Sequence, residues 1–181
     1  MFLPLLFAHL VADFILQPSK LIQWKFKSWK GVAVHAGVHF SVSLAVLLPF
    51  LSDWVVWAGL CSIALSHFLV DRWKVHHELH NHHYVSSFVT DQLLHFSFLG
   101  LAALFIGEPE WHFPDLQNFY ALTFIWIGLI SMLIASFVVE VFLYQFARQK
   151  TNAAFKPDYK ALVARGVAVV ILCFIAVLFQ K

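Results

Sequence analysis

Residues 54–71 read WVVWAGLCSIALSHFLVD, an apolar run in which the first charged residue is Asp71. A helix needs about 20 mostly apolar residues to cross the hydrocarbon core of a bilayer. The run therefore predicts a transmembrane helix. Near its end it carries His67 and Asp71, and a helix places two side chains at this spacing on one face.

Five other apolar stretches and the overall composition agree with a membrane protein. Of the 181 residues, 61% are hydrophobic and 12% are charged, and the mean hydropathy is +0.77. Such a composition excludes an ordinary soluble domain. We expect one integral membrane domain over residues 1–181, with a four-helix core in 1–106 and two additional spans in 107–181. The sequence predicts an all-α polytopic membrane helix bundle of about six transmembrane helices, in residues 2–17, 31–51, 54–71, 86–106, 120–146 and 162–179.

Charged residues alternate between basic and acidic loops along the chain. Residues 20–30 contain four lysines among aromatic residues, which suits an amphipathic segment in the headgroup layer. The third loop is also basic, with Arg72 and Lys74, and so is the fifth, with Arg148, Lys150, Lys156 and Lys160. The second loop is acidic through Asp53, and the fourth through Glu108, Glu110 and Asp115. By the positive-inside rule the basic loops are cytoplasmic. We therefore expect an inner-membrane protein with both termini on the outer side.

Four polar pairs lie within the apolar stretches, and the two members of each pair are four residues apart. They are His9 with Asp13, His35 with His39, His67 with Asp71, and Asp91 with His95. On a helix this spacing puts both side chains on one face, one turn apart. Each pair also lies near the predicted cytoplasmic end of its span. Eight ligand-type side chains are therefore expected to meet at one depth inside a four-helix bundle.

The residue types of these pairs predict a buried metal site. A charged aspartate inside a membrane costs about 2.5–3.5 kcal/mol on insertion scales unless cations or hydrogen bonds compensate it. Five imidazoles and three carboxylates favour zinc and are compatible with iron or manganese, whereas copper(I) prefers sulfur ligands. Eight ligands exceed the four that one zinc ion uses. We therefore expect one or two divalent ions, with the remaining side chains supporting the ligands.

Other polar residues admit two interpretations each. Five polar residues flank the pairs and are candidates for orienting an anionic substrate: Gln17, Lys20, Arg72, Lys74 and Gln92. The three cations among them equally suit a role as topology determinants. Residues 76–83, HHELHNHH, place five histidines in the predicted third loop; a solvated loop is the favoured interpretation and a weak metal-binding tract the alternative. Glu140 and Arg165 lie in the last two predicted spans, where an ion pair between them is the favoured interpretation and a contact with substrate the alternative.

The motifs around the pairs resemble those of a widespread bacterial membrane protein family of unknown function, over roughly the first hundred residues. They are His9-Leu-Val-Ala-Asp13-Phe-Ile-Leu-Gln17, His35-Ala-Gly-Val-His39, Ser66-His67-Phe-Leu-Val-Asp71-Arg-Trp-Lys74 and Asp91-Gln92-Leu-Leu-His95. Residues 35–39 and 66–71 are also similar to motifs of the YdjM-like inner-membrane metal-dependent hydrolases, His-Arg-x-x-Thr-His-Ser and Ser-His-x-x-x-Asp. This chain has Ala36 and Val38 where that pattern has Arg and Thr. The second similarity implies metal-dependent hydrolysis.

Two activities follow as hypotheses. The first is a metal-dependent hydrolase in which an activated water attacks an ester, amide or phosphoester of a lipid-linked or small-molecule substrate that enters from the cytoplasmic leaflet. The alternative is a metal- or proton-coupled transporter, because intramembrane His and Asp residues also build ion pathways; a non-catalytic membrane subunit is the third reading. Membrane lipids are the expected surroundings. A net charge of +2 indicates no nucleic-acid partner, and the oligomeric state stays open.

Overall fold

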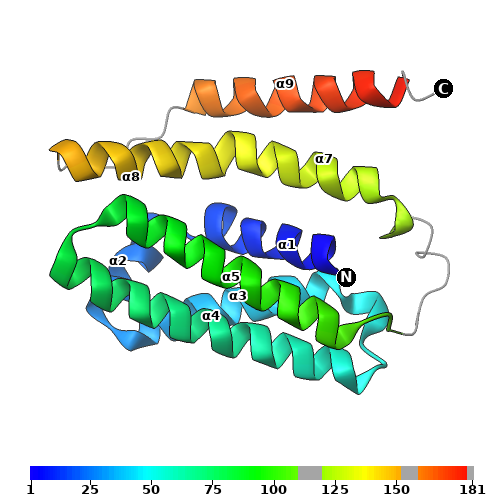
Figure 1. Ribbon diagram of the computed structural model, residues 1–181, viewed down its shortest axis with the longest axis horizontal. Coiled ribbons are helices and arrows are strands. Elements are labelled where there is room, and N and C mark those ends of the chain that lie inside the picture. The colour runs from blue at the N-terminus through cyan, green and yellow to red at the C-terminus, as the bar shows by residue number, and fades with distance from the viewer. Residues whose placement is uncertain (110–119, 152–158, 179–181) are drawn as a thin grey trace.

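The computed structural model describes residues 1–109, 120–151 and 159–178, and every regular element in these ranges is helical (Figure 1). The first elements are α1 (Phe2–Leu10), the π-helical segment η1 (Val11–Ile15), α2 (Ser19–Lys27), α3 (Trp29–Val46), the 3-10 turn η2 (Leu48–Phe50), α4 (Trp54–Asn81) and α5 (Tyr84–Ile106). They are followed by α7 (Thr123–Leu133), the π-helical segment η4 (Ile134–Val138), α8 (Val139–Thr151) and α9 (Tyr159–Leu178). The all-α prediction is confirmed for this part of the chain.

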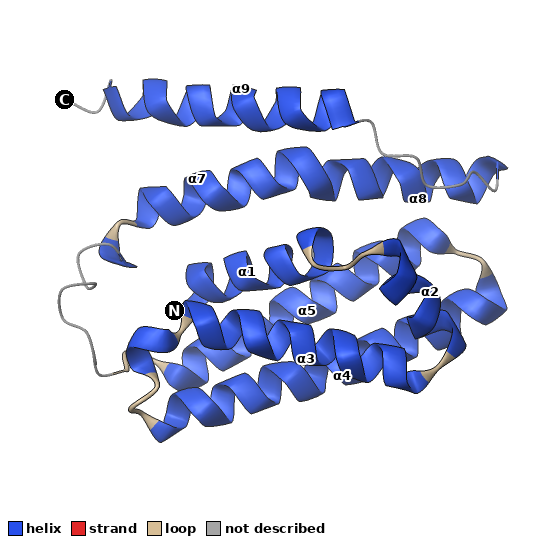
Figure 2. Cartoon of the chain, turned by 180° about the vertical axis from the view of Figure 1, so that it is seen from behind, coloured by secondary structure: helices blue, strands red, loops and turns tan. Residues whose placement is uncertain are grey.

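The helices are arranged around a four-helix group formed by α1, α3, α4 and α5. The rod made by α7, η4 and α8 packs against α1 and α5, and α9 lies outermost on α7 and η4. Figures 1 and 2 both show α2, the turn between α4 and α5, and the end of α8 at one end of the molecule. The start of α1, the α3–α4 connection and the start of α7 lie at the opposite end. The basic segments therefore gather at one end.

Three described helices are long and apolar enough to cross a membrane, namely α4, α5 and the continuous helix Thr123–Thr151. Phe2–Ile15 and Ser19–Lys27 meet the same criterion only together, and they are bent by 89° relative to each other. The structure thus supports three or four membrane-crossing segments. The count of about six stays a prediction.

Helices α4 and α5 expose large apolar side chains and bury polar ones, the reverse of a soluble helix bundle. Leu65, Leu93 and Leu104 are 61%, 60% and 80% exposed, whereas His67 and Asp91 are only 2% and 1% exposed. In water such a surface would be unfavourable, because each exposed leucine forgoes the hydrophobic stabilisation of burial. The distribution is the one expected where lipid surrounds the helices.

The interior of the four-helix group has an apolar half and a polar half. Leu5, Phe50, Leu60 and Ile106 belong to a buried apolar cluster near the α3–α4 connection. A smaller apolar cluster joins α1 to α7 through Leu10, Trp126, Ile130 and Leu133. The buried histidines and aspartates occupy the half toward α2, so the fold separates hydrophobic packing from the polar site.

The predicted third loop is mostly helical. α4 continues ten residues past the apolar run and ends before His82, whose φ of 54° is the left-handed conformation that often terminates helices. The expectation of a loop over residues 76–83 was therefore wrong for residues 76–81. Apolar length marks the part of a helix inside the bilayer, while backbone hydrogen bonding continues beyond it. Glu110, Asp115 and Lys156 of the other predicted loops lie outside the described residues.

The predicted ion pair between Glu140 and Arg165 is confirmed. Arg165 Nη2 on α9 donates to Glu140 Oε2 on α8 at 2.6 Å, and also approaches the carbonyl oxygen of Ser136 at 3.4 Å. Gly166 lies next to the same place, since a Cβ there would be 2.9 Å from Ser136 Oγ. Helix α9 is thus attached to η4 and α8 by a charged contact and by a close approach.

Gly31 allows α2 to lie directly against the start of α3. A Cβ at this position would be 2.5 Å from the carbonyl carbon of Trp24 and 2.6 Å from the amide nitrogen of Lys25. We expect Gly31→Ala to displace the backbone of α2 and to lower the free energy of unfolding by about 1–3 kcal/mol, as overpacking does. The measurement is the thermal unfolding midpoint of the purified protein.

Gly37 provides the matched control, because no atom lies within 4 Å of the Cβ that Gly37→Ala would add on the same helix. Its midpoint should be unchanged or slightly higher, since alanine has the better helix propensity. Equal losses of stability in the two variants would contradict the close packing of α2.

Candidate metal centre

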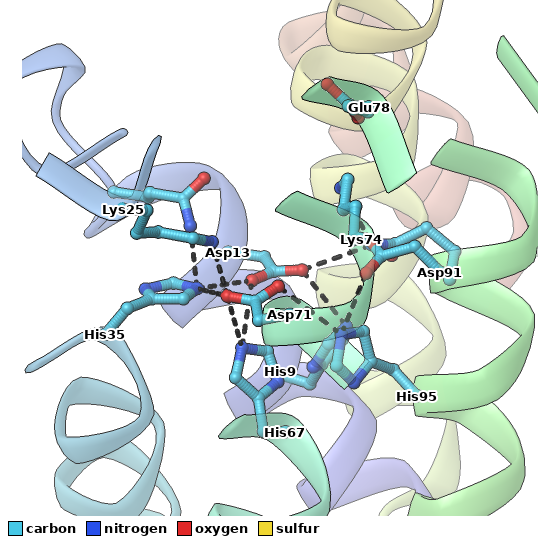
Figure 3. A network of polar contacts seen from close by, with 12 residues as sticks. His9, Asp13, Lys25, His35, His67, Asp71, Lys74, Glu78, Asp91 and His95 are labelled. Carbon is cyan, nitrogen blue, oxygen red and sulfur yellow. Dashed lines mark hydrogen bonds and ion pairs between the residues drawn. The ribbon is translucent and has the colours of Figure 1, made fainter. Parts of the chain in front are cut away.

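The eight predicted ligand residues come together in the polar half of the four-helix group (Figure 3). His9 lies on α1, Asp13 on η1, His35 and His39 on α3, His67 and Asp71 on α4, and Asp91 and His95 on α5. The five imidazoles are at most 3% exposed, two of the carboxylates are at most 2% exposed, and the Asp13 side chain is 9% exposed. The spacing of four residues within each pair therefore does direct both members to one interior.

The Asp13 carboxylate connects all the helices of this group. His35 Nε2 and His39 Nε2 each lie 3.0 Å from Asp13 Oδ1. Gln92 Nε2 donates to Asp13 Oδ2 at 3.2 Å, and His9 Nε2 is 3.4 Å from the same oxygen. His67 Nε2 of α4 lies 3.8 Å from Asp13 Oδ1. The Asp13 carboxylate therefore faces polar groups from α1, α3, α4 and α5.

A π-helical segment places Asp13 at this position. The amide of Leu16 donates to the carbonyl of Val11 at 3.0 Å, five residues back, which is the bond of a π-helix. Such segments are rare and occur frequently at functional sites. Beyond η1 the chain turns by 89° into α2, which returns Lys25 toward the cluster.

The other two carboxylates are each paired with a lysine. Lys25 forms an ion pair with Asp71, and Lys74 Nζ lies 2.7 Å from Asp91 Oδ2. His95 Nε2 stands between the two carboxylates, 3.3 Å from Asp91 Oδ1 and 3.9 Å from Asp71 Oδ1. The two ammonium groups offset part of the negative charge that the three aspartates bring into the interior.

Three imidazole nitrogens of the cluster converge without a hydrogen bond, although each lies 3.3–3.6 Å from a carboxylate oxygen. The Nε2 atoms of His9, His67 and His95 are buried and have no hydrogen bond to any described group, and ligand atoms of these residues lie within 4.8 Å of one another. The rings of His67 and His95 stack at 4.1 Å. Buried nitrogens without hydrogen bonds are unfavourable, whereas three converging imidazoles are a common zinc-binding set. The donor set therefore fits a divalent metal.

Two further groups of ligand atoms overlap with this one. One contains Asp13, His35, His39 and His67, and the other contains Asp71, Asp91 and His95. His67 and His95 each belong to two of the three groups, so the eight residues form one continuous cluster. It can hold one or two ions, with the remaining side chains hydrogen-bonded to the ligands.

The structure separates the five flanking polar residues into two sets. Gln17 Nε2 lies 2.7 Å from an imidazole of α3, Gln92 lies beside two carboxylates, and Lys74 pairs with one of them. Lys20 and Arg72 are exposed. Only the first three are therefore in direct contact with the cluster.

Lys25 is a site residue that sequence reasoning missed. Its place among four lysines assigned it to the headgroup layer, but it is 7% exposed and ion-paired with Asp71. An available signal was the charge balance, because three buried aspartates require more cations than the spans themselves provide.

A cavity of about 420 Å³ adjoins the cluster. Asp13 and Asp71 line it, together with Lys25, Lys74 and Arg148. Its walls come from η1, α2, α4 and α5 on one side and from η4, α8 and the start of α9 on the other. A small molecule or a lipid headgroup would fit in this volume.

The part of the chain that holds the cluster matches a known family. The model of the family described as "Protein of unknown function (DUF3307)" matches residues 1–119, which include all eight cluster residues. No curated protein and no solved structure matches the chain. Because the family match covers 119 of the 181 residues, the chain belongs to this family of proteins of unknown function, DUF3307.

Proposed function

We propose that this protein is a metal-dependent hydrolase of the bacterial inner membrane that acts on a membrane-accessible substrate from the cytoplasmic side. The observation that carries the proposal is the convergence of three buried imidazole nitrogens that make no hydrogen bond, beside carboxylates and next to a cavity of about 420 Å³. Residues 35–39 and 66–71 resemble motifs of the YdjM-like hydrolases in part, with Ala36 and Val38 departing from that pattern.

In this proposal, side chains of the protein bind the metal ion, orient its ligands and stabilise charge on the substrate. The proposed ligands are drawn from the eight cluster residues, and zinc is favoured by their mixture of nitrogen and oxygen donors. A divalent ion there supplies Lewis-acid activation of water and of the scissile bond. Gln92 holds the carboxylates of Asp13 and Asp91 through its amide. Lys74 lines the cavity and is placed to stabilise negative charge that develops on the substrate.

The distribution of polar groups favours this activity over transport. The half of the four-helix group opposite α2 is packed with apolar side chains, among them Leu60 and Leu99, which are 0% and 3% exposed. A metal- or proton-coupled transporter needs polar groups through both halves of the membrane or a rearrangement that supplies them. In this proposal the site is therefore reached from one side.

Metal content is the first test. We expect wild-type protein purified in detergent to contain one or two divalent ions per chain by elemental mass spectrometry. His67→Ala should lose at least one ion, because His67 belongs to two of the three ligand groups. His76→Ala, an exposed histidine on the same helix, is the matched control and should keep the wild-type content. Wild-type protein without stoichiometric metal would defeat the metal-dependent function.

Hydrolysis is the second test, with ester, amide and phosphoester panels presented in micelles and vesicles. Asp13→Asn should lower turnover by about 10- to 100-fold, the usual effect of disturbing a metal ligand or its partner. Glu108→Gln, which alters an exposed carboxylate outside the cluster, should retain activity. Ion uptake into proteoliposomes by a protein that turns over none of the panels would favour the transporter.

Topology is tested by cysteine labelling in cells, after Cys61 and Cys173 are replaced. Ser52→Cys lies in the α3–α4 connection and Ser86→Cys near the α4–α5 turn, and both serines are exposed. A membrane-impermeant maleimide should label Ser52→Cys in intact cells and Ser86→Cys only after lysis, because the basic loops are expected inside. The reverse pattern would place the cluster toward the outer side.

A further inference from the structure

The cavity beside the cluster is completed by helices outside the family match. Residues 1–119 supply the cluster and one wall. The other wall comes from η4, α8 and the start of α9, and it includes Glu140, Tyr144, Gln145 and Arg148. The chemistry and the binding surface thus come from different parts of the chain.

The polar lining of the cavity is nearly balanced in charge. Three cations line it, each close to an acidic partner: Lys25 to Asp71, Lys74 to Asp91 and Arg148 to Glu78. Four carboxylates line the cavity, those of Asp13, Asp71, Glu78 and Glu140, so the formal charge of the lining is −1. One divalent ion at the cluster changes this to +1. An anionic ligand then becomes electrostatically favourable.

Arg148 is fixed in an orientation suited to an anion. Its Nη1 lies 3.4 Å from Glu78 Oε2, and its guanidinium stacks 3.7 Å from the ring centre of Tyr84. The side chain is still 27% exposed. A guanidinium held on an aromatic face with free donors is a typical phosphate-binding group.

Apolar side chains line the same cavity. Phe14, Phe26 and Phe88 belong to the first wall, and Phe137, Val141 and Leu162 to the second. The amphipathic helix α2 forms part of this lining through Ile22 and Phe26. A ligand of the cavity therefore meets cations and a hydrocarbon-compatible surface together, as the headgroup and chain of a lipid would require.

Two buried side chains of the lining carry acceptor atoms that make no hydrogen bond to a described group. Gln145 is 9% exposed and Glu78 is 3% exposed, and Gln145 Oε1 and Glu78 Oε1 have no hydrogen-bond partner among the described groups. Such atoms are rarely left unpaired in the interior of a protein. Both residues line the cavity, so a rotation of either side chain would bring its acceptor oxygen to a hydroxyl of a bound headgroup.

We propose, building on the hydrolase function above, that the substrate is a phosphate-bearing amphiphile and that α8 selects it. The phosphate faces Lys25, Lys74 and Arg148, and the hydrocarbon chain lies on the surface formed by Phe137 and Leu162. In the reaction a water oxygen bonds to phosphorus and the ester bond from phosphorus to the lipid oxygen breaks. One water proton goes to the leaving oxygen and the other stays on the released phosphate.

Binding to the zinc-loaded protein in a neutral maltoside detergent tests this inference. The probe is a fluorescent short-chain phosphatidic acid, compared with phosphatidylcholine carrying the same label, and inorganic phosphate serves as competitor. We expect phosphatidic acid to bind at least about tenfold more tightly than phosphatidylcholine, because its headgroup keeps a net negative charge. Chelation should weaken this binding, and millimolar phosphate alone should compete poorly.

Arg148→Gln should weaken phosphatidic acid binding by about tenfold. Lys150→Gln is the matched control, since Lys150 is an exposed cation on the same helix that does not line the cavity. If Arg148→Gln leaves Glu78 unpaired and the protein unfolds, the double variant Glu78→Gln with Arg148→Gln removes both charges together and should show the same loss of binding.

The outcomes separate this inference from the hydrolase function. Equal binding of the two lipids, equal effects of Arg148→Gln and Lys150→Gln, or inorganic phosphate binding as tightly as phosphatidic acid would each overturn the amphiphile proposal. Metal content and turnover of other esters are measured on the same samples. A metal-loaded, active protein without phosphatidic acid selectivity would refute only the substrate class, whereas a metal-free, inactive protein would refute the function.

Discussion

The Asp13 carboxylate is the interaction on which the arrangement of the polar half depends. It lies within 3.0–3.8 Å of imidazoles from α1, α3 and α4 and accepts a hydrogen bond from Gln92 of α5. A carboxylate inside an apolar bundle is destabilising by several kcal/mol unless it is paired. Because those partners come from all the surrounding helices, satisfying this one group fixes how the helices meet. Lys25 and Lys74 likewise pair with the buried carboxylates of Asp71 and Asp91.

The sequence was informative wherever local spacing determines structure. The helical period predicts that His67 and Asp71 share a face, and the loop charges predict that all four pairs lie at one depth. The structure brings residues of all four pairs together in one cluster. Spacing says nothing about contacts between distant segments. The return of Lys25 to Asp71 depends on the bend after η1 and on Gly31, and the extension of α4 to Asn81 depends on backbone hydrogen bonds. The contribution of α8 to the cavity wall depends on its packing against α5, which the spacing of residues does not predict.

The chain combines a part that resembles its family with a part outside the family match. The match over residues 1–119 includes every cluster residue, whereas Arg148 and Gln145 lie beyond it. The two parts pack together along α1 with α7 and along α5 with α8 as well as around the cavity, so the binding surface is held rigidly against the cluster. The π-helical segments η1 and η4 pack on each other, so the irregular turn that positions Asp13 lies against the irregular turn of the second wall.

The ion pair between Glu140 and Arg165 constrains how the last two described helices associate. An arginine inside a bilayer is unfavourable by about 2.5–3.5 kcal/mol on insertion scales, and α9 carries Arg165 in a largely apolar sequence. Its guanidinium finds its carboxylate on the helix that immediately precedes it, at 2.6 Å. The neutralising charge is therefore already present when α9 leaves the ribosome. The two charges cancel only while α9 stays against α8, so any change that separates these helices leaves both charges uncompensated.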